Sequence, residues 1–184
     1  MEQEHLAVIF GSPTSQETPL VRVHSECLTG DVFSSARCDC GPQLEESLRI
    51  LNARGGILLY LRQEGRGIGL YHKVQAYALQ DEGMDTYEAN QALGLPADAR
   101  DFHDAARMLH ALGIHRCRLI TNNPDKVRQL TANGIKVVEC VRTGVFVNAN
   151  NYRYLAAKKH RAQHVIELPV VEVADSGGCH DRTS

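Results

Sequence analysis

Three cysteines, Cys27, Cys38 and Cys40, place the strongest constraint on how this chain can fold. Their spacing, C-x10-C-x-C, allows three thiols to converge on one metal ion, because Gly30 and Asp31 supply turn-forming residues within the longer spacer. Cys38 and Cys40 lie two residues apart, so an extended strand would point both side chains to one side. Thiolates favour zinc, and three protein ligands leave a position open for water, as in catalytic sites. The alternative is a pair of strands with buried free cysteines.

The length and composition of the chain indicate one soluble domain. At 184 residues it is long enough for one well-packed core and too short for two comfortable domains. Lys and Arg total 20 against 22 Asp and Glu, which gives no support to a sequence-independent nucleic-acid binder. No apolar run approaches the length of a membrane span, and the N-terminus lacks the features of a signal peptide. We therefore expect a cytoplasmic protein that contacts neither nucleic acid nor membrane.

Apolar runs alternate with amphipathic segments, which predicts an α/β fold with a mixed β-sheet flanked by helices. The predicted strands are 6–10, 20–24, 57–61, 117–121 and 135–140, and the predicted helices are 42–54, 69–82, 86–93, 101–112, 124–133 and 151–164. Pro42 is well suited to the first turn of a helix, and Gly55 to its end. No repeat or linker divides the chain. We assign residues 1–173 to a single domain and expect residues 174–184 to form a mobile tail.

Two polar segments directly follow predicted strands and contain the residue types of phosphate sites. In RQEGRGIG, at 62–69, three glycines let the backbone approach a ligand, while Arg62 and Arg66 offer planar guanidinium groups. In TNNPDK, at 121–126, Thr121 and Lys126 could reach a phosphate at the start of the next helix. Taken alone, the second segment favours an Asn helix cap with a solvated lysine. The spacing of the first fits neither a Walker loop nor a dinucleotide fingerprint.

Six motifs, in their order and spacing, resemble those of GTP cyclohydrolase II. They are RVHSECLTGD, RCDCG, RQEGRGIGL, DTYEAN, ADARDF and LITNNPDK, and the resemblance extends over residues 20–164. Members of this family open the imidazole ring of GTP, remove C8 as formate and release pyrophosphate. The product, 2,5-diamino-6-(5-phosphoribosylamino)pyrimidin-4(3H)-one, is the first intermediate of riboflavin synthesis. The resemblance implies this activity for residues 1–173, with one catalytic Zn²⁺ per chain, Mg²⁺ on the triphosphate and a homodimer.

The same motifs imply roles for individual residues. Cys27, Cys38 and Cys40 match the zinc ligands of the family. The positions that match GTP contacts are Arg22, Val23, His24, Ser25, Glu26, Gln43, Glu64, Gly65, Arg66, Thr86, Thr121 and Lys126. Asp98 matches a proposed proton acceptor, Arg100 a proposed nucleophile, and Tyr77 an active-site tyrosine near the purine. We do not expect His24 to bind the metal, because the family pattern uses water at that position.

Arg100 is chemically awkward as a nucleophile, because a guanidinium has a pKa above about 12 and normally only donates hydrogen bonds. Asp98 could accept its proton if the pair were buried. The alternative is that Arg100 stabilises charge at the α-phosphate while water attacks. Without the resemblance, both residues would be assigned to a surface loop.

Three alternative functions stay open at this point. Met84 stands where many members of the family carry tyrosine, and a change near the purine could stop the reaction at a formylated pyrimidine, as in a specialised pathway. The second alternative is a GTP-binding module without catalysis, which the presence of Cys27, Cys38, Cys40, Asp98 and Arg100 argues against. The third is a small zinc-stabilised structural or nucleic-acid module, against which the missing fourth ligand and the acidic net charge count.

Overall fold

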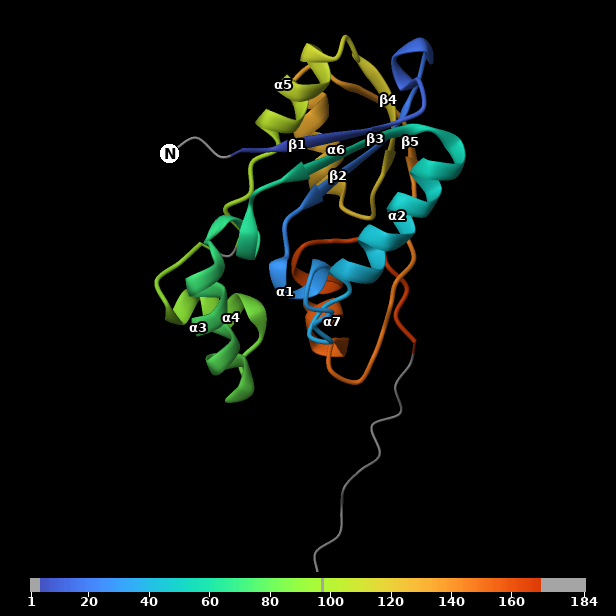
Figure 1. The fold of residues 1–184 in the computed structure, drawn as a ribbon. Coiled ribbons are helices and arrows are strands. Elements are labelled where there is room, and N and C mark those ends of the chain that lie inside the picture. Colours follow the sequence, from blue (N-terminus) through green and yellow to red (C-terminus); the bar gives the residue numbers. More distant parts are fainter. Residues whose placement is uncertain (1–3, 97, 170–184) are drawn as a thin grey trace, which may run out of the picture.

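Five strands form one mixed sheet at the centre of the protein, in a computed structural model that describes residues 4–96 and 98–169 (Figure 1). The strands are β1 (Leu6–Phe10), β2 (Leu20–Ser25), β3 (Gly56–Leu61), β4 (Arg116–Ile120) and β5 (Lys136–Val141). Their order across the sheet is β1-β3-β2-β4-β5, with β1 antiparallel to β3 and the other neighbours parallel. The carboxyl ends of the four parallel strands therefore meet at one edge, where open α/β sheets bind their ligands.

Helices cover both faces of the sheet and extend beyond this edge (Figure 1). They are α1 (Leu28–Asp31), α2 (Cys40–Arg54), α3 (Leu70–Asp81), α4 (Thr86–Ala92), α5 (His103–Ala111), α6 (Pro124–Ala132) and α7 (Tyr152–Arg161), with 3-10 turns η1 (Pro13–Ser15) and η2 (Glu64–Gly67). Helices α5 and α6 pack on one face and α2 on the other. No helix in the described part of the chain is long and apolar enough to cross a membrane.

The side chains of β2 alternate between the two faces of the sheet. Val21 and Val23 pack into the core under α5 and α6, whereas Leu20 contacts the α2 side with Leu51. A strand has a period of two, so Arg22 and His24 share the α2 side with Leu20. Both polar side chains are almost fully buried. The register of β2 therefore directs two polar groups toward the amino end of α2, beside the cysteines.

The predicted α/β fold and all its strands and main helices are confirmed, but two local predictions were wrong. Helix α2 begins at Cys40 and not at Pro42. Proline is tolerated at any position of the first helical turn, because the N–H groups there have no intrahelical partner, so Pro42 does not mark the first residue of the helix. Cys38 and Cys40 accordingly lie in a loop and a helix start, and not in an extended strand. The short helix α1 was not expected, and the predicted boundary at 173–174 lies outside the described residues.

Gly56 offers a test of how tightly the sheet contacts α2. It has a φ of +150°, and a Cβ there would lie 2.4 Å from the Leu20 carbonyl oxygen and 2.6 Å from Leu51 Cδ2. We expect Gly56→Ala to lower the free energy of unfolding by about 2 kcal/mol more than Gly83→Ala does, as measured by urea denaturation. Gly83 is the matched control, because it has a φ of +107° and no atom within 4 Å of a Cβ. Equal losses would contradict the close contact.

Candidate active site and metal centre

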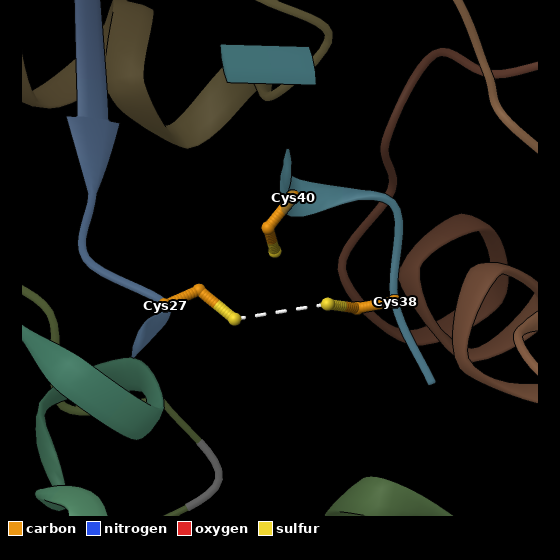
Figure 2. A group of neighbouring side chains, drawn as sticks. All are labelled: Cys27, Cys38 and Cys40. Carbon is orange, nitrogen blue, oxygen red and sulfur yellow. Dashed lines mark hydrogen bonds between the residues drawn. The ribbon is translucent and has the colours of Figure 1, made fainter. Parts of the chain in front are cut away.

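The three cysteines predicted as metal ligands lie together beyond the carboxyl end of β2. Their sulfur atoms all lie within 4.8 Å of one another, and Cys27 Sγ is 3.7 Å from Cys38 Sγ. Figure 2 shows the side chains of Cys27, Cys38 and Cys40 pointing toward one another, Cys27 from one stretch of backbone and Cys38 and Cys40 from another. Within residues 4–96 and 98–169, no histidine or carboxylate joins this group. Three thiol donors with one side open fit a tetrahedral zinc ion that keeps one position for another ligand.

Two glycines make room for the convergence of the three sulfurs. A Cβ on Gly30 would lie 2.8 Å from Cys38 Sγ and 3.1 Å from Cys27 Sγ, closer than real side chains approach. A Cβ on Gly41 would lie 2.3 Å from the carbonyl oxygen of Gly30. Helix α1 and the start of α2 therefore meet backbone to backbone, and this contact leaves the space between the thiols free for an ion.

The buried carboxylate of Asp31 fixes the segment that carries Cys27. It accepts hydrogen bonds from the backbone N–H of Cys27 at 3.0 Å, from the Tyr60 hydroxyl at 2.8 Å and from His24 Nε2 at 3.2 Å. Burial lowers the pKa of His24, so its ring is neutral and donates through Nε2, while Nδ1 lies 3.4 Å from Arg22 NH2. His24 thus supports the site through Asp31 and does not belong to the cysteine group.

Glu64 and Lys73 form a second support for the same segment. One Glu64 oxygen accepts from the backbone N–H of Leu28 at 2.6 Å, and the other accepts from Lys73 Nζ at 2.8 Å. Lys73 Nζ also lies 3.1 Å from Cys27 Sγ. The ammonium group therefore offsets negative charge on the thiolates. Lys73 was missed in the sequence, because nothing in its neighbourhood along the chain marks a contact with Cys27.

The cysteine group faces a cavity of about 820 Å³ at the carboxyl edge of the sheet. The predicted site residues that line this cavity are Ser25, Glu26, Cys27, Cys38, Cys40, Glu64, Gly65, Arg66, Tyr77, Thr86 and Arg100. The predicted residues outside its lining are Arg22, Val23, His24, Gln43, Asp98, Thr121 and Lys126. The structure therefore brings most of the predicted set around one space and places the rest behind it.

A network of hydrogen bonds connects Arg22 to the cysteine loop. Arg22 NH2 donates to Gln43 Oε1 at 3.2 Å, and Gln43 Nε2 donates to Asp39 Oδ2 at 2.6 Å. Asp39 is 1% exposed and also accepts from Lys158 Nζ at 2.8 Å. Asp39 stands between Cys38 and Cys40 in the sequence, so this network holds the loop that carries these two cysteines.

Arg66 reaches into the cavity from a strained turn. Its φ is +60°, in the left-handed region that is costly for a side chain other than glycine. The guanidinium lies 4.5 Å from the centre of the Tyr87 ring, and its buried NH1 has no hydrogen-bond partner among the described residues. Ala99 N donates to the Arg66 carbonyl at 2.9 Å, which ties this turn to the segment that carries Arg100. Strain of this kind is typical of ligand-binding positions.

Asp98 and Arg100 form a partly buried ion pair and not an ordinary surface contact. Arg100 Nε donates to Asp98 Oδ1 at 2.9 Å, and NH2 donates to Oδ2. Burial alone would lower the pKa of Arg100, but the hydrogen bonds and charge of Asp98 raise it above its ordinary value. Burial would likewise raise the pKa of Asp98, and Arg100 brings it below its ordinary value. Both groups are therefore charged in the site.

The segment at 121–126 supports the end of β2 from behind the cavity. Asn123 caps α6, since its side chain accepts from Asp125 N at 2.9 Å, as one predicted interpretation had it. The solvated lysine of that interpretation was wrong, because Lys126 is buried and its Nζ donates to the Val23 carbonyl at 2.7 Å. Burial, followed by the charges of nearby cations, lowers the pKa of Lys126. Thr121 accepts from Asn123 N at 3.0 Å.

Residues of α7 and of the segment after it complete the cavity, and none of them was predicted as a site residue. Tyr154, Lys158 and His164 line the same space as the cysteines. Burial, followed by the positive charges of Lys158, Arg100, Lys126 and Arg66, lowers the pKa of His164 to about 3. The cations that line the cavity outnumber its two carboxylates, Glu26 and Glu64, which favours an anionic ligand; they are Arg37, Arg66, Lys73, Arg100 and Lys158. The closing helix was predicted over 151–164 but ends at Arg161, so His164 lies in the segment after it. No local pattern in the sequence reveals which residues this part of the chain will face.

Met84 lies beside this cavity and not in its lining. It lines a neighbouring space together with residues that border both, Arg37, Thr86 and Tyr154 among them. Methionine in place of the tyrosine of many family members therefore alters the neighbouring space, and Met84 is not among the residues that line the cavity with the cysteines.

The glycine contact gives the site its first test. We expect Gly30→Ala to lower the metal content of the purified protein well below that of the wild type, because the added methyl group displaces two of the sulfurs. Metal per chain would be measured by inductively coupled plasma mass spectrometry. Cys140→Ser is the control, because Cys140 is an exposed thiol outside the group. Full metal content in Gly30→Ala would contradict the proposed fit.

Comparisons with known proteins agree with this arrangement. The sequence profile of the GTP cyclohydrolase II family matches residues 1–142. A protein of Vibrio cholerae named GTP cyclohydrolase-2 is 58% identical over 168 residues, which cover 91% of this chain and 85% of that protein. A protein of the same name from Neisseria gonorrhoeae is 52% identical over 165 residues, which cover 89% of this chain and 84% of that protein. The resemblance seen in the motifs is thereby confirmed, and the chain belongs to the GTP cyclohydrolase II family of hydrolases.

Proposed function

We propose that this chain hydrolyses GTP, opening the imidazole ring and releasing formate and pyrophosphate. The product is 2,5-diamino-6-(5-phosphoribosylamino)pyrimidin-4(3H)-one, and the reaction is the first step of riboflavin biosynthesis. One observation carries the proposal: a single cavity is lined both by three convergent thiols and by several cationic side chains. A metal site for water activation and a site for a polyanion are what this chemistry requires together. The family and the names of the relatives support the same substrate.

We assign a zinc ion to Cys27, Cys38 and Cys40. Zinc held by these thiolates would supply a Lewis acid for the hydrolysis at C8 of the purine. Three thiolates would donate much negative charge to the zinc ion and weaken its Lewis acidity, so nearby groups assist the reaction in this proposal. Lys73 Nζ, 3.1 Å from Cys27 Sγ, offsets part of that charge. Tyr77 lines the cavity, and its hydroxyl lies 3.0 Å from Thr29 Oγ1. Burial raises the pKa of Tyr77, so its hydroxyl stays protonated, and we assign it as a hydrogen-bond donor beside the purine.

We place the triphosphate, with Mg²⁺ on its oxygens, against the cationic side of the cavity. Arg66 and Arg100 offer guanidinium forks there. The nucleoside would contact the residues that line the remaining surface, Ser25, Glu26, Glu64, Gly65 and Thr86. The predicted contacts outside the lining act as supports in this proposal, with Arg22, His24 and Gln43 holding the cysteine segments and Val23, Thr121 and Lys126 holding the end of β2.

Arg100 acts electrostatically in the proposed mechanism. Formation of a covalent intermediate would require its guanidinium to lose a proton, and Asp98 raises its pKa and opposes this loss. Asp98 is itself a weak base, since its pKa is lowered by the same pair. Hydrolysis at the α-phosphorus is therefore assigned to water, with Asp98 orienting Arg100 and Arg100 stabilising the charge that develops on the phosphate.

Product analysis tests the overall reaction. The zinc-loaded protein would be incubated with GTP and Mg²⁺, and formate, pyrophosphate and the pyrimidine would be followed by mass spectrometry. We expect formate and pyrophosphate in equal amounts. Pyrophosphate with a formylated pyrimidine would instead support the specialised alternative, although Met84 lies outside the main cavity. Binding of GTP without either product would support a non-catalytic module.

Substitution of Arg100 tests its role. We expect Arg100→Lys to lower kcat by about 100-fold, because a single ammonium cannot replace the fork that Asp98 orients. Arg107→Lys is the matched control, since Arg107 is an exposed arginine on α5 whose ion pair is with Asp104. Rapid quenching followed by mass spectrometry of the intact wild-type protein would show a guanylyl adduct if Arg100 were the nucleophile. That adduct would contradict the electrostatic role.

We further propose a homodimer in the cytoplasm, with no nucleic-acid or membrane partner. Membership of the family supports the homodimer, and sedimentation equilibrium of the zinc-loaded protein would test this oligomeric state.

A further inference from the structure

The end of the described chain contributes part of the cavity that the family profile does not include. The profile stops at residue 142, whereas Tyr154, Lys158, Ala162 and His164 all line the cavity that the cysteines face. None of these four residues belongs to the six family motifs, and none has a role in the proposed chemistry so far. His164 is notable among them, because imidazole can both donate and accept a hydrogen bond.

The backbone around His164 is fixed by several contacts. After the end of α7, Gln163 adopts a φ of +53°, which turns the chain back toward the sheet. His164 N then donates to the Lys158 carbonyl at 3.2 Å, and Val165 N donates to the Asn122 carbonyl at 3.0 Å. Ile166 is buried and anchors the segment from the other side. A left-handed residue other than glycine costs about 1 kcal/mol, so this turn is held in place by its surroundings.

The side chain of His164 lines the cavity, and the charges of four cations from different parts of the fold act on it. Lys158 belongs to α7, Lys126 to α6 and Arg66 to η2, and Arg100 precedes α5. Their charges, after burial, are the causes that lower the pKa of His164. In the described part of the chain, neither ring nitrogen forms a hydrogen bond, although the residue is half-buried. A neutral ring with free nitrogens among cations is arranged for an anion that satisfies both the ring and the charges.

We propose that His164 contacts the phosphate chain of the bound nucleotide, together with Lys158. This inference rests on the proposed function and adds a substrate contact from outside the motifs. Lys158 is held at the cavity wall by Asp39 at 2.8 Å and lies over the Tyr154 ring at 4.5 Å. His164 follows α7 across a single tight turn, and Lys158 and His164 line the same cavity, so both groups face the same part of the ligand in this proposal.

Binding of separate pieces of the substrate tests this contact. Tripolyphosphate and guanosine would each be titrated into the zinc-loaded full-length protein by isothermal titration calorimetry. We expect His164→Phe, which keeps a ring and removes both nitrogens, to weaken tripolyphosphate binding by about tenfold or more and to leave guanosine binding unchanged. His164→Gln retains a donor and should recover most of the affinity. His160→Phe is the control, since His160 is an exposed residue on α7.

The outcomes separate this inference from the proposed function. Unchanged tripolyphosphate binding in a folded His164→Phe, or a loss confined to guanosine, would overturn the phosphate contact while GTP turnover by the wild type still supports the enzyme. If His164→Phe does not fold, His164→Ala decides: a loss of tripolyphosphate affinity that His164→Gln recovers supports the contact, and wild-type affinity in His164→Ala overturns it. A wild-type protein that neither converts GTP nor binds tripolyphosphate would overturn both.

Discussion

The carboxylate of Asp31 is the interaction on which the site depends. His24 and Tyr60 stand opposite each other in the register of β2 and β3, their rings stack at 5.6 Å, and both reach Asp31. Burial raises the pKa of Tyr60, so its hydroxyl remains a donor. Because the same carboxylate accepts from the Cys27 backbone, the position of Cys27 is set by the pairing of two central strands. Loss of this carboxylate would leave buried donors unpaired and release the cysteine segment.

Local patterns in the sequence predicted the elements and the ligands, because those depend on neighbours along the chain. The period of apolar residues predicted the sheet and its helices, and the cysteine spacing predicted three convergent thiols. The start of α2 was placed two residues too late, since a proline in the first turn does not mark which residue begins the helix. Lys73, Lys158 and His164 were missed, because their contacts join segments far apart in the sequence.

Net charge conceals the electrostatics of the cavity. The chain carries a formal charge of −2, yet four cations act on His164 and lower its pKa. Asp98 and Asp39 pair with two of these cations, Arg100 and Lys158, and the positive charge that remains attracts an anion. A polyanionic ligand therefore stabilises the fold and also binds more tightly at low ionic strength. The same field explains how a protein with balanced composition selects a highly charged substrate.

The distance along the chain between the two halves of the site has a consequence for synthesis and folding. Lys158 and Asp39 are 119 residues apart, and α7 docks against elements made much earlier. Contacts of such sequence separation form late, after the entropy of closing a long loop has been overcome. A nascent chain can therefore complete its sheet and gather its cysteines while the nucleotide cavity still lacks a wall. Competence to bind the nucleotide would arise only when the last helix has left the ribosome and packed in place.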